Sequence, residues 1–214
     1  MKAVIFDLDG VLCTTDKYHY YAWKNIADGL GIYFDEEINN RLRGVSRMES
    51  LNIILECGKL EVSEEEKLEL AKRKNKIYRR LLENLTPRDI SEGAVETIDK
   101  LRAAGLKLAV GSSSKNTPFI LERLGLANYF DAISDGNNIS RSKPYPEVFL
   151  KAAQMLGLES GECLVVEDAL SGVVAAHEAG MLCACVGDAA KAGAGDYNMR
   201  SISELLDIVL KRGE

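Results

Sequence analysis

The sequence predicts an α/β protein, in which a Rossmann-like parallel sheet core is covered by helices and carries an inserted α-helical cap domain. Two observations favour this class. Short apolar runs alternate with helical segments that each end near a glycine, a rhythm typical of parallel sheets packed between helices. One long stretch, residues 15–86, departs from that rhythm because its whole pattern is helical. A chain of 214 residues is long enough for one such core with a large insertion.

Four apolar runs predict the buried strands, because a strand covered on both faces shows a continuous apolar run. They are residues 2–7 (KAVIFD), 106–111 (LKLAVG), 163–166 (CLVV) and 181–186. The helices of the core are predicted at residues 94–104, 118–124, 146–156 and 170–179. A glycine follows each of these helices, and glycine readily adopts the left-handed conformation that ends one.

The inserted stretch is rich in charge and holds no run apolar enough for a buried strand. Ser63 and Glu66 have the spacing of a capping box, which predicts the start of a long helix. Pro87 marks the return to the core. We therefore predict a core domain formed by residues 1–14 and 87–214, and a helical cap domain formed by residues 15–86. The two connections between them are the expected hinges.

The composition restricts the class of partner. The chain has 27 Lys and Arg against 33 Asp and Glu, and the net charge of −6 argues against a protein that mainly binds nucleic acid or anionic lipid. The first apolar run is interrupted by Asp7 and Asp9, so it predicts neither a signal peptide nor a membrane span. Five scattered cysteines are expected to be reduced, small apolar residues. We expect a cytoplasmic protein with no nucleic-acid or membrane partner, and a monomer by default.

Carboxylates follow the first predicted strand. Asp7 and Asp9 lie two positions apart, so both side chains can project to the same side of the chain. Ligands of open parallel sheets bind at the carboxyl ends of the strands. An isolated D-x-D is more often an acidic turn, so this pair alone does not identify a site.

Three further segments supply the groups that a phosphate and a metal ion need. A hydroxyl-rich loop predicts either a phosphate cradle or a simple helix cap, at Ser112, Ser113, Ser114, Lys115 and Asn116. Lys143, next to a proline, is either a fixed cation or a surface residue. Glu167 and Asp168 are adjacent acids after an apolar strand, and a divalent cation is the natural partner of such acids.

In this order the four motifs resemble the haloacid dehalogenase superfamily of phosphotransferases, over essentially the whole chain. The resemblance implies that Asp7 is the nucleophile that becomes an aspartyl-phosphate, and that Asp9 is the general acid and base. It implies a Mg²⁺ cofactor held by Asp7, the backbone carbonyl of Asp9, Glu167 and Asp168. It assigns Lys143 and Ser112 to the charge of the transferring phosphoryl group. A cis peptide before Pro144 also follows from the resemblance.

The cap segment is similar to that of the β-phosphoglucomutase-like subfamily. The resemblance implies interconversion of β-D-glucose 1-phosphate and glucose 6-phosphate through a β-glucose 1,6-bisphosphate, with a sugar-phosphate phosphatase as the alternative. It implies catalytic roles for Thr15 and His19, and a grip of Arg47 on the phosphate that is not transferred. The implied substrate-binding residues are Asp9, His19, Gly44, Val45, Arg47, Lys74, Asn75, Ser112, Ser113, Ser114, Lys115 and Asn116.

Simpler explanations remain for several of the cap residues. Taken alone, His19 is more often a half-buried histidine, and residues 72–76 are most simply a solvated helix face. Trp23 is as readily cap core as sugar platform, so it is left out of the predicted site. The chain also departs from the subfamily pattern at Arg43, where a lysine is usual, at Ala169, where a serine is common, and at Thr14, where an acid is usual. Arg43 keeps the positive charge.

Overall fold

The computed structural model describes residues 1–43 and 45–210, and its strands form one parallel sheet. The strand order is β3-β2-β1-β4-β5-β6, and β1 lies at the centre between β2 and β4. The strands are β1 (Ala3–Phe6), β2 (Lys107–Gly111), β3 (Ala132–Ser134), β4 (Cys163–Glu167), β5 (Leu182–Cys185) and β6 (Tyr197–Asn198). This order confirms the predicted Rossmann-like core.

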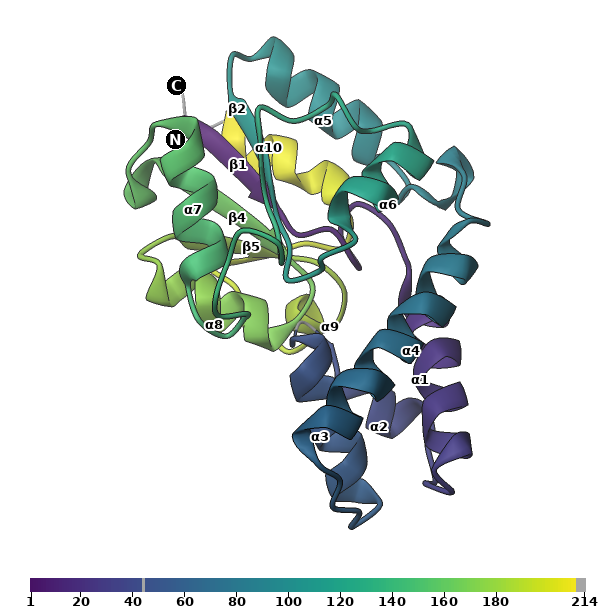
Figure 1. The fold of residues 1–214 in the computed structure, drawn as a ribbon. Coiled ribbons are helices and arrows are strands. Elements are labelled where there is room, and N and C mark those ends of the chain that lie inside the picture. The colour runs from purple at the N-terminus through teal and green to yellow at the C-terminus, as the bar shows by residue number, and fades with distance from the viewer. Residues whose placement is uncertain (44, 211–214) are drawn as a thin grey trace.

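Helices cover both faces of the sheet, as Figure 1 shows. One face carries α5 (Ala94–Ala103), α6 (Thr117–Leu124) and α10 (Leu205–Leu210), and the other carries α7 (Glu147–Leu156) and α8 (Leu170–Glu178). A short helix, α9 (Gly187–Lys191), follows β5.

The central strand β1 has the continuous apolar run that burial on two faces requires. Its alternate residues belong to different apolar clusters: Val4 and Phe6 pack on the α5 and α6 side, and Ala3 and Ile5 on the α7 and α8 side. All of its side chains are fully buried. A strand buried on both faces gains apolar burial from every residue, which is why no polar residue interrupts the run before its end.

The predicted strands and core helices are found within a residue or two of their expected bounds. The glycines that follow α5, α6, α7 and α8 all have positive φ: Gly105, Gly125, Gly157 and Gly180. Two strands escaped the prediction, β3 and β6, because runs of three and two residues carry no periodic pattern.

In the described part of the inserted stretch, four helices lie below the sheet in Figure 1: α1 (Asp16–Gly29), α2 (Glu36–Asn40), α3 (Arg47–Cys57) and α4 (Glu64–Leu82). The capping box of Ser63 and Glu66 opens α4 as predicted. The helices bury an apolar cluster of their own, which includes Trp23 and Ile54 and is separate from the two clusters of the sheet. Helices α1 and α4 also contribute to a cluster of the sheet, through Tyr18, Ala22, Tyr78 and Leu82, so the cap packs on the core at this end.

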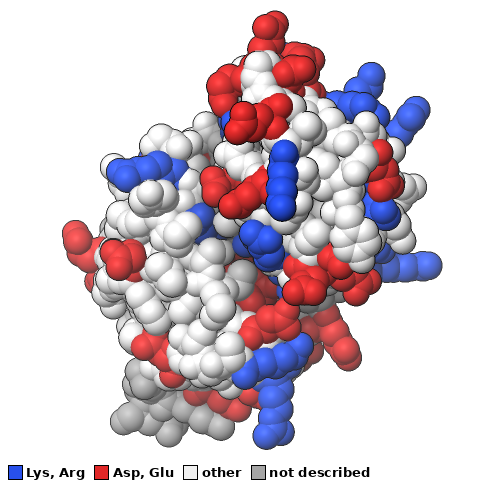
Figure 2. All heavy atoms as spheres, turned by 90° about the horizontal axis from the view of Figure 1, so that it is seen from below, with Lys and Arg blue, Asp and Glu red and all other residues white. Residues whose placement is uncertain are grey.

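Three further features concern the surface charge, the search for membrane-spanning helices and the cysteines. The face seen from the cap side in Figure 2 carries acidic and basic side chains interspersed. Within residues 1–43 and 45–210, no helix combines the length and apolarity needed to cross a bilayer. All five cysteines are free, as predicted, and four of them are buried.

Candidate active site

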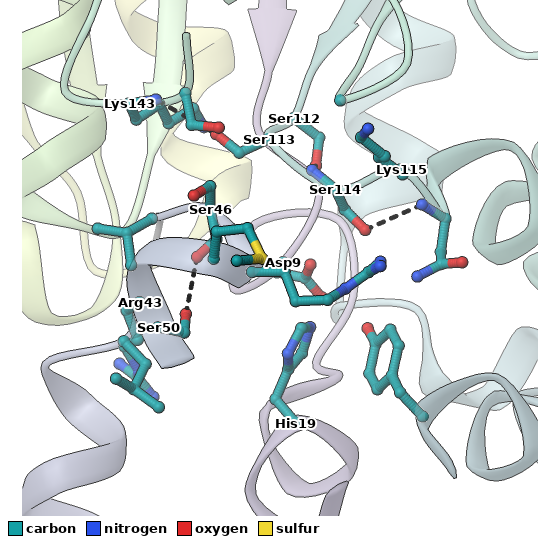
Figure 3. A pocket seen from close by; sticks show the side chains of 18 of the residues that line it. Asp9, His19, Arg43, Ser46, Ser50, Ser112, Ser113, Ser114, Lys115 and Lys143 are labelled. Carbon is teal, nitrogen blue, oxygen red and sulfur yellow. Dashed lines mark hydrogen bonds between the residues drawn. The ribbon is translucent and has the colours of Figure 1, made fainter. Parts of the chain in front are cut away.

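A cavity of about 560 Å³ lies where the cap meets the carboxyl ends of the core strands. Figure 3 shows core side chains such as Asp9 and Ser114 facing Arg43, Ser46 and His19 of the cap. The predicted residues that line the cavity are Asp7, Asp9, His19, Val45, Arg47, Lys74, Ser112, Ser113, Ser114, Lys115, Asn116, Lys143, Glu167 and Asp168. Thr15 and Asn75 contact residues of this set. Gly44 lies outside the described residues.

The core half of the site is built around Lys143, whose side chain is buried between two strand ends. Its Nζ donates to Asp7 Oδ1, at the end of β1, at 2.5 Å, and also to Glu167 Oε1, at the end of β4. Burial alone would lower the pKa of Lys143, but the charges of Asp7 and Glu167 outweigh it and raise that pKa above its usual range. Lys143 is therefore a fixed cation, not a surface residue, and its peptide bond to Pro144 is cis as expected.

Glu167 is held on both of its oxygens. While Oε1 accepts from Lys143, Oε2 accepts from the backbone N–H groups of Asp168 at 2.9 Å and Ala169 at 3.0 Å. A buried carboxylate that accepts this many bonds is fixed in position, and it fixes the lysine in turn.

Three carboxylates of the core half fit a divalent cation. Asp7, Glu167 and Asp168 each offer an oxygen, and these oxygens lie within 4.8 Å of one another. Burial, the first cause, and the charge of Glu167 raise the pKa of Asp7 to about 7 and that of Asp168 to about 8, although Lys143 acts against both shifts. Oxygen donors that are costly to charge together suit a hard cation such as Mg²⁺. The carboxylate of Asp9 is not part of this group.

Gly10 permits the close approach of β1 and β4 at this point. Its φ of +85° is a left-handed conformation, and a Cβ there would lie 2.1 Å from Asp168 Oδ2. Any side chain at this position would displace Asp168, so steric exclusion explains why a glycine follows the D-x-D pair.

Asp9 is held from the cap side of the cavity. Thr15 is the N-cap residue of α1, but its hydroxyl donates to Asp9 Oδ1 and makes no cap bond. Thr15 Oγ1 in turn accepts from the Tyr78 hydroxyl of α4 at 3.1 Å. Burial raises the pKa of Asp9 to about 6 against the opposing bond from Thr15. A carboxyl that titrates near neutral pH is suited to both accepting and donating a proton.

His19 and Lys74 form a second contact behind Asp9. Lys74 Nζ lies 2.9 Å from His19 Nδ1, and the ammonium lies over the rings of Tyr78 and Trp23, 4.3 and 4.8 Å from their centroids. Burial and the nearby Lys74 lower the pKa of His19 well below its usual value, so the ring is neutral and Nδ1 accepts from the lysine. Lys74 is 2% exposed, so the solvated-face interpretation of residues 72–76 is wrong at this position.

The serine-rich loop and the cap meet through an asparagine. Asn75 Oδ1 accepts from Arg47 at 2.7 Å and from Asn116 Nδ2 of the loop at 3.0 Å. Within the loop, the backbone N–H of Ser114 donates to Ser112 Oγ at 3.2 Å. These bonds bring the predicted cap cation to the loop that precedes α6.

The cavity is also lined by residues that the sequence prediction left out, among them Asp16, Asn39, Arg43 and Tyr78. Tyr78 and Asn39 are buried, and Arg43 contacts Asp16 and the core residue Asp188. One signal for Tyr78 was available, since it lies one turn after Lys74 on the same face of α4. Nothing local in the sequence indicates the partners of Arg43. Trp23 also lines the cavity, although it is 1% exposed and packs as cap core.

Comparisons with known proteins agree with this geometry. The haloacid dehalogenase-like hydrolase family profile matches residues 1–180. β-Phosphoglucomutase of Bacillus subtilis is 42% identical over 96% of this chain and 92% of its own length. The crystal structure of β-phosphoglucomutase from Clostridium difficile superposes with a TM-score of 0.94 at 36% identity, covering 99% of this chain and 96% of that one.

A phosphatase is also similar. The phosphorylated carbohydrates phosphatase of Thermotoga maritima is 32% identical over 85% of this chain and 82% of its own length. The family profile, the relatives and the fold confirm the resemblance that the four motifs indicated. The chain is therefore an enzyme of the haloacid dehalogenase-like hydrolase family.

Proposed function

We propose that this enzyme is a Mg²⁺-dependent phosphotransferase that interconverts β-D-glucose 1-phosphate and glucose 6-phosphate. The reaction runs through an aspartyl-phosphate and a β-glucose 1,6-bisphosphate. One observation carries the proposal: a cap cation, Arg47, lines the same cavity as the core pair Asp7 and Lys143. A bisphosphate needs two separate cationic sites, one for the phosphate that reacts and one for the phosphate that does not.

Asp7 is the proposed nucleophile. Lys143 holds its Oδ1, and no described residue donates a hydrogen bond to its Oδ2, so Oδ2 is the oxygen that attacks phosphorus. The bond from phosphorus to the sugar oxygen breaks as the bond to Oδ2 forms, and an aspartyl-phosphate results. Lys143 stays protonated, and it offsets charge on the phosphoryl oxygens together with the hydroxyl of Ser112.

The carboxylates of Asp7, Glu167 and Asp168, with the backbone carbonyl of Asp9, are the proposed ligands of Mg²⁺. When bound, the ion neutralises charge on the phosphoryl group and orients it for in-line transfer. Glu167 keeps Lys143 beside the same group, because its two oxygens are fixed by the lysine and by two backbone N–H groups.

Asp9 is the proposed proton carrier. It gives a proton to the sugar oxygen that leaves phosphorus and takes one from the sugar hydroxyl that attacks the aspartyl-phosphate. Thr15, the first residue of the cap, orients the Asp9 carboxyl, and Tyr78 in turn orients Thr15. The base is thus aligned by cap groups, which favours a sugar hydroxyl held under the cap over a water molecule in an open site.

Arg47 and the serine-rich loop are the proposed site of the second phosphate. Asn75 positions Arg47 and also contacts Asn116 of the loop, so the guanidinium faces a segment rich in N–H and hydroxyl donors. Val45, Gly44 and His19 are proposed to contact the sugar. Once the bisphosphate has formed, it reverses its orientation, so that the phosphate that faced Arg47 now faces Asp7. Transfer of this phosphate to Asp7 then leaves the isomeric sugar monophosphate.

A sugar-phosphate phosphatase is the second candidate. Similarity to phosphatases of Thermotoga maritima and Escherichia coli, at 32% and 30% identity, favours it. The core half of the site serves both reactions, because the two differ only in whether a sugar hydroxyl or water attacks the aspartyl-phosphate.

One assay separates the candidates. β-D-glucose 1-phosphate is supplied with Mg²⁺ and a trace of bisphosphate, and glucose 6-phosphate and inorganic phosphate are measured together. A mutase forms glucose 6-phosphate with little inorganic phosphate. Release of one inorganic phosphate per sugar phosphate consumed, without glucose 6-phosphate, would show a phosphatase.

A further inference from the structure

Arg43 joins the cap to the core. It lies in the segment between α2 and α3, and its Nη1 donates to Asp188 Oδ2 on α9 of the core at 2.7 Å. Its Nη2 donates to Asp16 at the start of α1. The backbone carbonyl of Arg43 also accepts from the Ser171 hydroxyl of α8 at 3.4 Å. One cap residue therefore bonds to two core helices and to the first helix of the cap.

Each acid that Arg43 holds is next to a residue that bonds to a carboxylate residue of the site. Asp16 directly follows Thr15, the donor to Asp9. On the other side, the backbone N–H of Ala189, next to Asp188, donates to the Asp168 carbonyl at 2.9 Å. Arg43 thus links the segment that orients the acid–base group to the segment that packs on a carboxylate of the core half.

Arg43 lines the cavity, but its charge is already paired with carboxylates of the protein. Both terminal nitrogens donate to carboxylates, and Nε is buried with no partner among the described residues. The planar guanidinium suits such a bridge, whereas a lysine ammonium is a single point charge. A guanidinium neutralised by two acids is a poor ligand for a sugar phosphate.

We infer that Arg43 is a positioning residue, which holds the cap closed over the core by bridging Asp16 and Asp188 and so keeps Thr15 aligned with Asp9. The bridge is partly solvated, since the side chains of Arg43, Asp16 and Asp188 are 30%, 33% and 60% exposed. Ion pairs of this exposure shift an equilibrium by roughly two- to fivefold, which holds the closed form and still allows it to open for each substrate.

The Asp188→Asn variant tests the inference, because it removes the charge of the core arm at constant size. Small-angle scattering of the protein without substrate should give a larger radius of gyration than for the wild type. The kinetic expectation rests on the proposed function: KM for β-D-glucose 1-phosphate should rise roughly two- to fivefold with kcat little changed, because saturating substrate restores closure. Asp188→Glu should restore both readouts.

Lys191→Ala is the matched control. Lys191 is the other partner of Asp188, at 2.8 Å from Oδ1, and lies on the same helix. Its removal leaves the bridge to Arg43, so the scattering and KM should match the wild type. Wild-type scattering for Asp188→Asn, or the same change in both variants, would overturn the inference. The scattering needs no substrate, so a failure of the glucose 1-phosphate assay leaves this test standing.

Discussion

Lys143 in the core and Lys74 in the cap are 3% and 2% exposed, yet their surroundings are opposite. Lys143 lies between the carboxylates of Asp7 and Glu167, which raise its pKa. Lys74 lies against His19 and two aromatic rings, with no carboxylate within ion-pair distance in the described part of the chain. Burial and the charge of Arg47 lower the pKa of Lys74 well below its usual value.

The difference shows how the two halves of the site are built. The core half is a group of opposite charges fixed at strand ends, in contact with one another before any sugar binds. The cap half holds a buried amine, Lys74, whose hydrogen-bond partner is the His19 ring and whose pKa is lowered. We therefore expect substitutions in the core half to abolish phosphoryl transfer to any acceptor. Substitutions in the cap half should instead change whether a sugar hydroxyl or water accepts the phosphoryl group.

The strongest test of the core half is Asp7→Asn. The amide cannot attack phosphorus, so turnover of every phosphate ester should fall by roughly 10⁴-fold or more while the circular dichroism spectrum stays that of the wild type. Acid-quenched labelling should place phosphate on Asp7 of the wild type and leave the variant unlabelled. Label on another residue would show that the nucleophile lies elsewhere.

Metal dependence is the next test of the core half. Mg²⁺ at about 100 times its Kd should stabilise the wild type by about 2.7 kcal/mol, and Asp168→Ala should lose both this stabilisation and the activity. The measurement is thermal unfolding with and without Mg²⁺, alongside turnover in excess chelator. Asp99→Ala, at an exposed position of α5, is the control and should respond as the wild type does. Full turnover in chelator would contradict the proposal.

The two lysines can be compared directly by stability. Lys143→Met leaves Asp7 and Glu167 buried without their cation, and it should lower the metal-free free energy of unfolding by about 3–5 kcal/mol. Lys74→Met removes a buried amine that has no ion-pair partner and whose charged form burial already disfavours, so the loss should be near zero or reversed. Urea unfolding of both variants measures this. Equal losses would show that the two surroundings are energetically alike.

The pH dependence of Lys74 has a definite sign. Its pKa is lowered on folding, so above the folded pKa the unfolded chain binds more protons and the stability rises with pH. The free energy of unfolding of the wild type should therefore rise, relative to that of Lys74→Met, as the pH is raised toward the ordinary pKa of a lysine side chain. A constant difference between the two proteins over that range would contradict the shift.

The Arg47→Ala variant tests whether the cap half of the site holds a second phosphate. Loss of a phosphate partner should cost mutase turnover about 2–5 kcal/mol in transition-state free energy, with little change in hydrolysis of p-nitrophenyl phosphate. Arg41→Ala is the matched control, since Arg41 is an exposed cap arginine outside the cavity. Equal losses on both substrates would show that Arg47 does not hold a second phosphate.

Among the three substitutions tested by turnover alone or with labelling, Asp7→Asn, Arg47→Ala and His19→Ala, the smallest loss is expected for His19→Ala. His19 packs on Tyr78 with ring centroids 4.1 Å apart, and Tyr78 reaches Asp9 through Thr15. Mutase turnover should fall by about tenfold, because the variant loses the proposed contact with the sugar and an indirect support of Asp9 through Tyr78 and Thr15. Inorganic phosphate released per glucose 6-phosphate formed should rise. A constant ratio would mean that the cap half does not control the choice between sugar and water.

The sequence by itself determined the four longer strands of the sheet, the helices that end at glycines, the helical insertion and the polar strand ends. These features are local: an apolar run, a glycine with positive φ or a D-x-D is readable within a few residues. Asp7, Glu167 and Asp168 could be predicted together because parallel strands bring their carboxyl ends to one edge, whereas Lys143 was assigned to the site only through the family resemblance.

Only the tertiary structure decided how the cap groups meet the core. Arg43 and Asp188 are 145 positions apart, and Tyr78 and Thr15 are 63 apart. Such contacts depend on how the inserted helices are oriented relative to the sheet, which is set by the packing of whole surfaces. Short patterns carry no information on that orientation, so the bonds to Asp9 and the bridge of Arg43 required the fold.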